Sequence, residues 1–163
     1  MAKEEIFQGK VWRYGDNIDT DIIIAARYLN TFDPQELAKH CMADLDESFA
    51  QNVKAGDIMV GGRNFGCGSS REQAPAVLKA LGVRAVLAPS FARIFYRNSI
   101  NIGLPAIVCD GLYDAVKTGD EIDLDMEKGV VTFGEQTFSC TKLPVHLQKI
   151  LDRGGLISSL DEM

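Results

Sequence analysis

Hydrophobic positions in the middle of the chain follow two spacings, one typical of strands and one typical of helices. Short apolar runs predict strands, and apolar residues three or four positions apart predict helices. In chain order, the pattern predicts strands at 57–61, 83–88 and 104–108, with helices at 74–81 and 91–102 between them. Because strands that alternate with helices pair in parallel, we expect an α/β fold with a parallel sheet at its core.

The N-terminal flank is predicted to add two strands and a helix to this core. Residues 11–13 predict a short strand. Residues 20–26 contain three consecutive isoleucines and predict a strand segment buried on both faces, since continuous β-branched runs are typical of such strands. Asp33 before Pro34 predicts a helix start, with the aspartate as the cap and the proline at the first helical position. We expect that helix to end before Asp44.

The C-terminal flank is predicted to be rich in strands. Residues 120–141 predict two strands joined by one turn, either at Lys128-Gly129 or at Gly134, and residues 144–153 predict a final helix. No internal repeat, low-complexity tract or linker interrupts the 163 residues, so we expect a single domain over 1–163.

Composition and charge narrow the classes of function. The net charge is −6 and the sequence pI is about 4.9, with no run of Lys and Arg, which argues against a protein that binds nucleic acid. Four irregularly spaced cysteines and two histidines offer no ligand set, so we expect no metal to be bound by this chain. The charged N-terminus lacks the apolar region of a signal peptide, and no apolar run is long enough to span a bilayer. We therefore expect a cytoplasmic protein without a membrane partner.

The glycine-rich stretch 61–72, Gly-Gly-Arg-Asn-Phe-Gly-Cys-Gly-Ser-Ser-Arg-Glu, lies between a predicted strand and a predicted helix. Its glycines allow the backbone to approach a ligand closely, although a tight turn without a ligand would need them too. The stretch does not match a dinucleotide-binding fingerprint, a P-loop or a serine nucleophile elbow. These three classes of site are therefore not favoured.

Ser69, Ser70 and Arg71 stand at the mouth of the helix that follows this stretch. Amide groups at a helix N-terminus favour an anion, and arginine offers a planar fork suited to a carboxylate. The spacing Ser-x-x-Glu also fits a helix cap. Pro75 would then occupy the second turn, where it removes a hydrogen bond. We therefore expect the helix to begin later, at 73–75, and to leave both serines free to face a ligand.

Three blocks of the sequence resemble the swivelling domain of the aconitase superfamily and occur in the family's order. The blocks are Gly15-Asp16-Asn17-Ile18-Asp19-Thr20-Asp21-Ile22, Gly66-Cys67-Gly68-Ser69-Ser70-Arg71-Glu72, and Ser90-Phe91-Ala92-Arg93-Ile94-Phe95 with Asn98 and Gly103-Leu104-Pro105. The resemblance covers nearly the whole chain, whose length is similar to that of the stand-alone small subunit of isopropylmalate dehydratases. It implies an aconitase-type swivelling β/β/α domain with a parallel sheet core and added β-strands.

The resemblance also implies an activity and roles for particular residues. Family members are hydro-lyases, and this type interconverts 2-isopropylmalate and 3-isopropylmalate in leucine biosynthesis by removing water and adding it back. A [4Fe-4S] cluster on the large subunit is implied, so this chain alone would be inactive. Ser69 would be the general base, Arg71 would clamp a carboxylate of the hydroxy-acid substrate, and Ser70 would help to hold it. Asp21 would orient Arg71 or a neighbour.

The loop with Tyr28, Leu29, Asn30 and Thr31 matches the segment with which the family reads the substrate's side chain. Leu29 suits an apolar substituent such as isopropyl. Homoaconitase-type relatives tend to have a basic residue where this chain has Asn30, which favours an apolar substrate, although one apolar contact discriminates by only about 1–3 kcal/mol. The other reading is a surface loop with no role in substrate binding.

Two alternatives to isopropylmalate isomerisation stay open on the sequence. A related small subunit would act on methylmalate/citraconate, dimethylmalate or homoaconitate, and residues 28–31 are the discriminating feature. A non-catalytic module that binds a small anion would need Arg71 but not Ser69, so the presence of both residues favours an enzyme.

Overall fold

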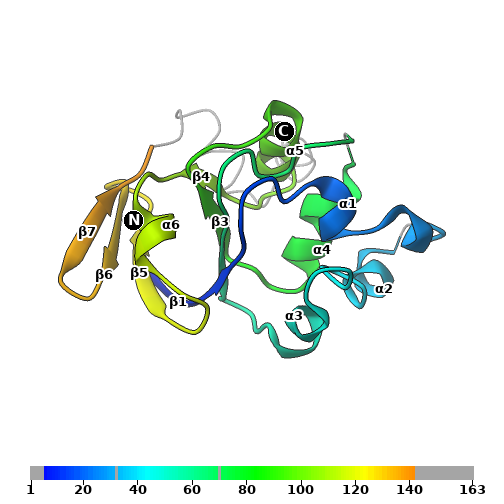
Figure 1. Cartoon of the computed structure of the whole chain (residues 1–163), viewed down its shortest axis with the longest axis horizontal. Helices are drawn as coiled ribbons and strands as arrows, with labels where there is room; N and C mark the ends of the chain where they lie inside the picture. The colour runs from blue at the N-terminus through cyan, green and yellow to red at the C-terminus, as the bar shows by residue number, and fades with distance from the viewer. Residues whose placement is uncertain (1–5, 32, 70, 142–163) are drawn as a thin grey trace, which may run out of the picture.

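A seven-stranded mixed sheet organises the part of the chain that the computed structural model describes, residues 6–31, 33–69 and 71–141 (Figure 1). The strand order is β4-β3-β2-β1-β5-β6-β7. The strands are β1 (Ile6–Arg13), β2 (Ile58–Val60), β3 (Ala85–Ala88), β4 (Ala106–Val108), β5 (Glu121–Asp125), β6 (Val130–Phe133) and β7 (Gln136–Ser139). Strands β1 to β4 pair in parallel, whereas β1, β5, β6 and β7 form antiparallel ladders.

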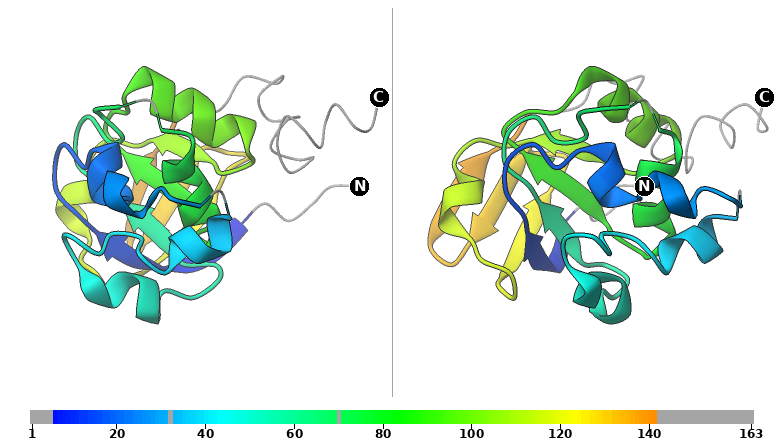
Figure 2. Two further views of the ribbon diagram at one scale, coloured as in Figure 1. Left: turned by 90° about the vertical axis from the view of Figure 1, so that its right-hand side faces the viewer. Right: turned by 45° about the vertical axis from the view of Figure 1, so that its right-hand side comes forward.

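Most of the helices cover one face of the parallel strands, and the antiparallel strands with the last helix cover the other. The helices are α1 (Thr20–Ile23), η1 (Ala26–Tyr28, a 3-10 turn), α2 (Pro34–Ala38), α3 (Glu47–Asn52), α4 (Gln73–Ala80), α5 (Arg93–Asn101) and α6 (Leu112–Ala115). In Figure 1, α1 to α4 lie to the right of β3, and α6 lies to the left with β5 to β7. Figure 2 shows the same separation in a turned view. The arrangement is the predicted β/β/α layering.

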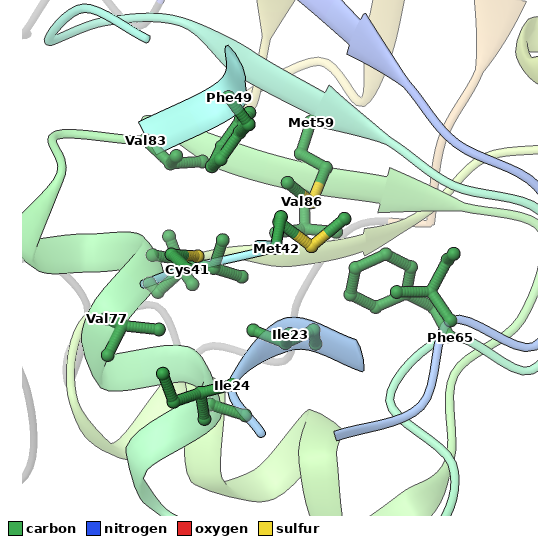
Figure 3. Packing of buried hydrophobic residues seen from close by; sticks show 14 of the residues in the cluster. Ile23, Ile24, Cys41, Met42, Phe49, Met59, Phe65, Val77, Val83 and Val86 are labelled. Atoms are coloured by element: carbon green, nitrogen blue, oxygen red, sulfur yellow. The ribbon is translucent and has the colours of Figure 1, made fainter. Parts of the chain in front are cut away.

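Side chains on the parallel strands point alternately into two hydrophobic cores, as the period of two along a strand requires. Met59 and Val86 enter the core beneath the helices, where Figure 3 shows them near Ile23 of α1. Their strand neighbours Ile58 and Leu87 enter the other core, under α6 and β5. Both faces of these strands are therefore buried, which explains why their sequences are continuous apolar runs.

The predicted parallel core is confirmed by the ladders β1–β2, β2–β3 and β3–β4. Helix α4 begins at Gln73, inside the predicted range, and the chain leaves it at Gly82 with a φ of +89°. A Cβ atom at Gly82 would lie 2.7 Å from Ala55 Cα, so this position needs glycine for space as well as for conformation.

The strand predicted for 20–26 is wrong, because the three isoleucines belong to helix α1 and the residue after it. The Asp19 carboxylate caps this helix by accepting a hydrogen bond from Ile22 N at 2.8 Å. Ile23 and Ile24 are fully buried in the core beneath the helices. The apolar run therefore reflects burial, and the capping aspartate decides the conformation.

The prediction of two strands for 120–141 is also wrong, because the chain uses both candidate turns and forms β5, β6 and β7. Gly129 and Gly134 have φ values of +70° and +60°, which glycine adopts without strain. The β6–β7 hairpin extends the antiparallel side of the sheet. The helix predicted for 144–153 lies outside the described residues.

Besides α1, the short helices η1, α3 and α6 were not predicted, and α2 is shorter than expected. Helix α2 starts as predicted, with Asp33 Oδ1 accepting from Gln35 N at 3.0 Å, but it ends at Ala38. Helix α3 has the same kind of cap at Asp46, and α6 follows Gly111.

Within the described residues, no helix is long and apolar enough to cross a membrane.

Candidate active site

The glycine-rich stretch is a tight loop that packs against helix α5. Gly66 and Gly68 have φ values of +84° and +94°, in the left-handed region. A Cβ atom at Gly66 would lie 2.2 Å from Phe95 Cγ, a distance that no side chain can occupy. The glycine at this position therefore lets the loop lie directly on the buried Phe95 ring.

Hydrogen bonds join the same loop to the segment that leads into α1. Gly66 N donates to Ile18 O at 2.7 Å, and Thr20 N donates to Cys67 O at 2.9 Å. The buried Thr20 hydroxyl donates to Ser69 O at 2.9 Å. Two of the three family-like blocks thus meet here, and their contact holds the Ser69 main chain beside α1.

Ser69 is exposed and is not the cap of α4. The N-cap residue of that helix is Glu72, and no side chain caps it. Ser69 O accepts from Arg71 N at 2.9 Å, so the main chain turns before the helix begins. Among the described residues, the Ser69 hydroxyl has no recorded hydrogen-bond partner. The late helix start leaves this hydroxyl open to a ligand, as expected from Pro75.

Arg71 is fixed through one end of its guanidinium group. Its Nη1 atom donates to Asp21 Oδ1 at 2.9 Å and to Ile24 O at 3.0 Å. The Arg71 side chain is 18% exposed, whereas that of Asp21 is 60% exposed. Within the described part of the chain, Nε and Nη2 of Arg71 have no recorded acceptor. The anchored guanidinium therefore retains donors with which it can bind a carboxylate.

Asp21 links Arg71 to the start of η1. The same Oδ1 atom that accepts from Arg71 also accepts from Ala26 N at 3.0 Å. The hydrogen bond from Arg71, helped by that of the Ala26 amide, lowers the pKa of the Asp21 carboxyl below its ordinary value. Asp21 thus stays ionised at neutral pH. The family resemblance implied that it orients Arg71 or a neighbour, and the structure places it in contact with Arg71. Figures 1 and 2 show α1 beside α4 in each view.

The segment with Tyr28, Leu29, Asn30 and Thr31 follows directly from this junction. Tyr28 ends η1 and stacks its ring on His40. Leu29 is half-buried against the core beneath the helices, and Asn30 is exposed. The Thr31 hydroxyl accepts a hydrogen bond from Asp33 N at 3.2 Å. The described contacts thus bring Asp21 and Arg71 together, while Tyr28 faces a different set of side chains.

The loop contains one more candidate residue, Ser70, and a cysteine, Cys67, that is not a candidate. Ser70 lies outside the described residues. Cys67 is half-buried in the loop, where partial burial and the neighbouring Asp19 raise the pKa of its thiol. A protonated thiol is a poor nucleophile and a poor metal ligand. Among the described residues, no group of three or more His, Cys, Asp or Glu could hold a metal ion.

Sequence reasoning missed the contribution of Thr20, His40 and Asp44. Thr20 stands in a family-like block, but its hydroxyl reaches Ser69 only because α1 is a helix. His40 and Asp44 contact η1 through side chains that are more than ten positions away in the chain. No local pattern in the sequence marks such contacts.

Comparison with known proteins identifies relatives over most of the chain. The family model of the aconitase C-terminal domain matches residues 14–110, a span that contains all three blocks. The 3-isopropylmalate dehydratase small subunit of Caldicellulosiruptor saccharolyticus is 56% identical over 93% of this chain and 89% of its own length. That of Thermodesulfovibrio yellowstonii is 54% identical, over 92% of this chain and 90% of its own length.

A solved structure shares the fold as well. The crystal structure of a 3-isopropylmalate dehydratase from Methanocaldococcus jannaschii superposes with a TM-score of 0.91. It is 46% identical in sequence and covers 96% of this chain and 94% of its own. The layered sheet described above is therefore the architecture of that protein.

Proposed function

This chain belongs to the family of 3-isopropylmalate dehydratase small subunits, within the aconitase C-terminal domain family, and on that premise we propose how its residues act. Its function is that of a hydro-lyase small subunit, which interconverts 2-isopropylmalate and 3-isopropylmalate in leucine biosynthesis together with a large subunit. The observation that carries the assignment of residues is that Ser69 is exposed and lies two positions before an Arg71 whose side chain Asp21 anchors.

Ser69 is the general base in this proposal. Its Oγ atom takes the proton from the carbon next to a substrate carboxylate and returns a proton in the reverse direction. A serine hydroxyl is a poor base in water, so the reaction needs a site that stabilises negative charge on Oγ. The main chain of Ser69 is held by the Thr20 hydroxyl, and the guanidinium of Arg71 supplies the positive charge two residues further along.

Arg71 binds a substrate carboxylate with the donors that Asp21 and Ile24 leave available. Because Nη1 is already engaged, the direction of the remaining donors is set before the substrate arrives. Asp21 is the residue that orients Arg71. Ser70 would add a contact to the same carboxylate, a role that stays a prediction because Ser70 lies outside the described residues.

The cluster that the family uses belongs, in this proposal, to the large subunit. A [4Fe-4S] cluster bound there would supply Lewis-acid chemistry toward the leaving hydroxyl group. Among the described residues, the cysteines of this chain offer no group of three ligands, because Cys109 and Cys140 lie opposite each other at an isolated bridge while Cys41 and Cys67 lie on other segments. This chain contributes the base and the carboxylate clamp, and its exposed Ser69 face is the one that must meet the partner.

The side chain of the substrate is read by the segment from Tyr28 to Thr31. Leu29 offers an apolar surface, and Asn30 lacks the positive charge that a third carboxylate would need. This combination favours isopropylmalate over homoaconitate, and the relatives reported above carry the name of the isopropylmalate enzyme. A cytoplasmic location also belongs to this proposal.

Reconstitution tests the proposed function. The chain is mixed anaerobically with a cluster-loaded isopropylmalate dehydratase large subunit, and the absorbance of the unsaturated intermediate is followed from 3-isopropylmalate. Turnover that requires both subunits supports the proposal. A verifiably assembled pair that is inert on isopropylmalate but turns over methylmalate or homoaconitate would refute the substrate, and inertness on every hydroxy-acid would refute the activity.

A further inference from the structure

A cluster of aromatic and charged side chains joins η1 to the segment after α2, and apart from Tyr28 none of its residues has a part in the proposed reaction. The rings of Tyr28 and His40 stack with their centroids 4.0 Å apart and their planes inclined by 2°. The guanidinium carbon of Arg27 lies 4.6 Å from the centroid of the Tyr28 ring, and Arg27 Nη2 donates to the Tyr28 hydroxyl at 3.1 Å. Arg27 also forms an ion pair with Asp44, in which Nη1 donates to Oδ2 at 3.0 Å.

These four residues come from two segments, a short 3-10 turn and a stretch of chain anchored in the core. Arg27 and Tyr28 belong to η1, whose internal bonds are those from Tyr28 N to Ala25 O and from Leu29 N to Ala26 O, each 3.0 Å long. A 3-10 turn of this length is marginal without outside support. His40 and Asp44 flank Cys41 and Met42, which are fully buried in the core beneath the helices (Figure 3).

The segment that carries His40 and Asp44 is hydrogen-bonded directly to α1. Met42 N donates to Ile23 O at 2.8 Å, and Met42 itself has a φ of +63°. His40 and Asp44 are therefore presented from a part of the main chain that the core holds in place. The turn η1 is attached to this frame through the four side chains, and to Asp21 through the amide of Ala26.

We propose that Arg27, Tyr28, His40 and Asp44 form a latch that positions the 28–31 segment over the Ser69 and Arg71 site. Tyr28 is then a positioning residue, because its ring is occupied by His40 and its hydroxyl by Arg27. The reading of the substrate's side chain falls to Leu29, Asn30 and Thr31. This inference rests on the proposed function, because it divides the residues of the 28–31 segment into one that positions the segment and three that contact the substrate.

The stack, and not the ion pair, is the main element of the latch. The side chains of Arg27 and Asp44 are 59% and 39% exposed, and ion pairs at such positions contribute little because solvent screens them. A cavity of 410 Å³, lined by the four latch residues together with Lys39 and Glu47, gives water access to the ion pair and to the stacked rings alike. The parallel rings, in contrast, remove apolar surface from water whatever the ionic strength.

Variants at His40 test the latch with two independent measurements. His40→Ala removes the ring, His40→Phe keeps a ring that can stack, and Lys39→Ala is the matched control, because Lys39 lines the same cavity but pairs with Glu36. In the assembled enzyme, KM for isopropylmalate should rise about threefold to tenfold in His40→Ala, the range that corresponds to one aromatic pair. The kcat should change less than about twofold, and both other variants should match the wild type.

Hydrogen exchange of the isolated subunit gives the second measurement, which does not depend on activity. Amides in a peptide that covers 26–31 should exchange about threefold to tenfold faster in His40→Ala than in the wild type, with rescue in His40→Phe. A His40→Ala variant whose exchange rates and KM equal those of the wild type would overturn the latch. A His40→Phe variant that behaves like His40→Ala would overturn it as well. If the wild-type pair is inert on isopropylmalate, the proposed function fails, and the exchange pattern alone decides whether the latch holds η1.

Discussion

The Asp21 carboxylate and the Arg71 guanidinium meet through a single oxygen, Oδ1, which also accepts the Ala26 amide. One atom therefore joins the carboxylate clamp of the proposed active site to the turn that leads into the substrate-reading segment. Any change that moves Asp21 should disturb both elements together. This relationship is the basis for the first two predictions.

Replacing Asp21 by Asn should lower kcat/KM of the assembled enzyme about tenfold. The amide oxygen can still accept from Arg71, but the hydrogen bond loses its charge, so the guanidinium is held less firmly in the direction that suits a substrate carboxylate. Steady-state kinetics with 3-isopropylmalate measures the effect. Glu121→Gln, an exposed carboxylate on β5, is the control and should leave kcat/KM unchanged. An Asp21→Asn enzyme as active as that control would show that Asp21 does not orient Arg71.

The Asp21 carboxyl should titrate below the ordinary aspartate pKa of about 3.9. The hydrogen bond from Arg71 favours its ionised form, so the folded-state pKa is lowered. The stabilisation from this pair is therefore fully present above the unfolded-state pKa and is lost as pH falls through the lowered folded-state value. Carboxyl-detected NMR of the isolated subunit measures the titration, and Arg71→Gln should move the Asp21 pKa upward. An unchanged pKa in Arg71→Gln would contradict the contact.

Replacing Thr20 by Val should remove the hydroxyl that donates to Ser69 O, at a cost of about 0.5–1.5 kcal/mol in the free energy of unfolding, because Ser69 O keeps the hydrogen bond from Arg71 N. The larger effect should be on kcat, because the main chain of the base loses a fixed partner. Thr20→Ser keeps the hydroxyl and is the matched control. Urea denaturation and steady-state kinetics, run on the same three proteins, separate stability from activity. Equal kcat values for Thr20→Val and Thr20→Ser would argue against a positioning role.

Replacing Gly66 by Ala should destabilise the domain by about 2–5 kcal/mol, the sum of a strained backbone and an overpacked contact. The new Cβ atom would meet Phe95 at 2.2 Å, with a φ of +84°. Gly119→Ala is a matched control, because Gly119 also has a positive φ, +102°, but no atom lies within 4 Å of its Cβ position. The control should lose only about 1–2 kcal/mol. Similar urea midpoints for the two variants would show that the loop is not packed on α5.

The sequence predicted the parallel core and α4 correctly because their signals are local. Continuous apolar runs, the spacing of apolar residues in α4 and the glycine after it each act over a few positions. The isoleucine run before Ala25 misled the prediction, since burial produces such runs in a helix as well as in a strand. The aspartate at position 19 was the better signal, and it is visible in the sequence.

The candidate site likewise contains residues that a local motif identifies and contacts that only the tertiary structure reveals. Ser69 and Arg71 could be selected from a motif, because they lie two positions apart on one loop. The contact between Asp21 and Arg71 joins residues 50 positions apart, and it was expected only from a resemblance to a known family. The stack of Tyr28 on His40 was not expected at all. It depends on how the segment after α2 returns to α1, which tertiary packing decides.

The role of Ser69 as the general base is tested most directly by a Ser69→Ala variant. Its turnover number and its substrate affinity are measured in a cluster-loaded, verifiably assembled complex. We predict that kcat of the Ser69→Ala complex for 3-isopropylmalate is about 10²–10⁴-fold lower than that of the wild type, the usual contribution of a general base. The Kd of the substrate should stay within a few-fold of the wild-type value. A Ser69→Ala complex whose kcat remains close to that of the wild type would contradict the assignment of Ser69 as the base.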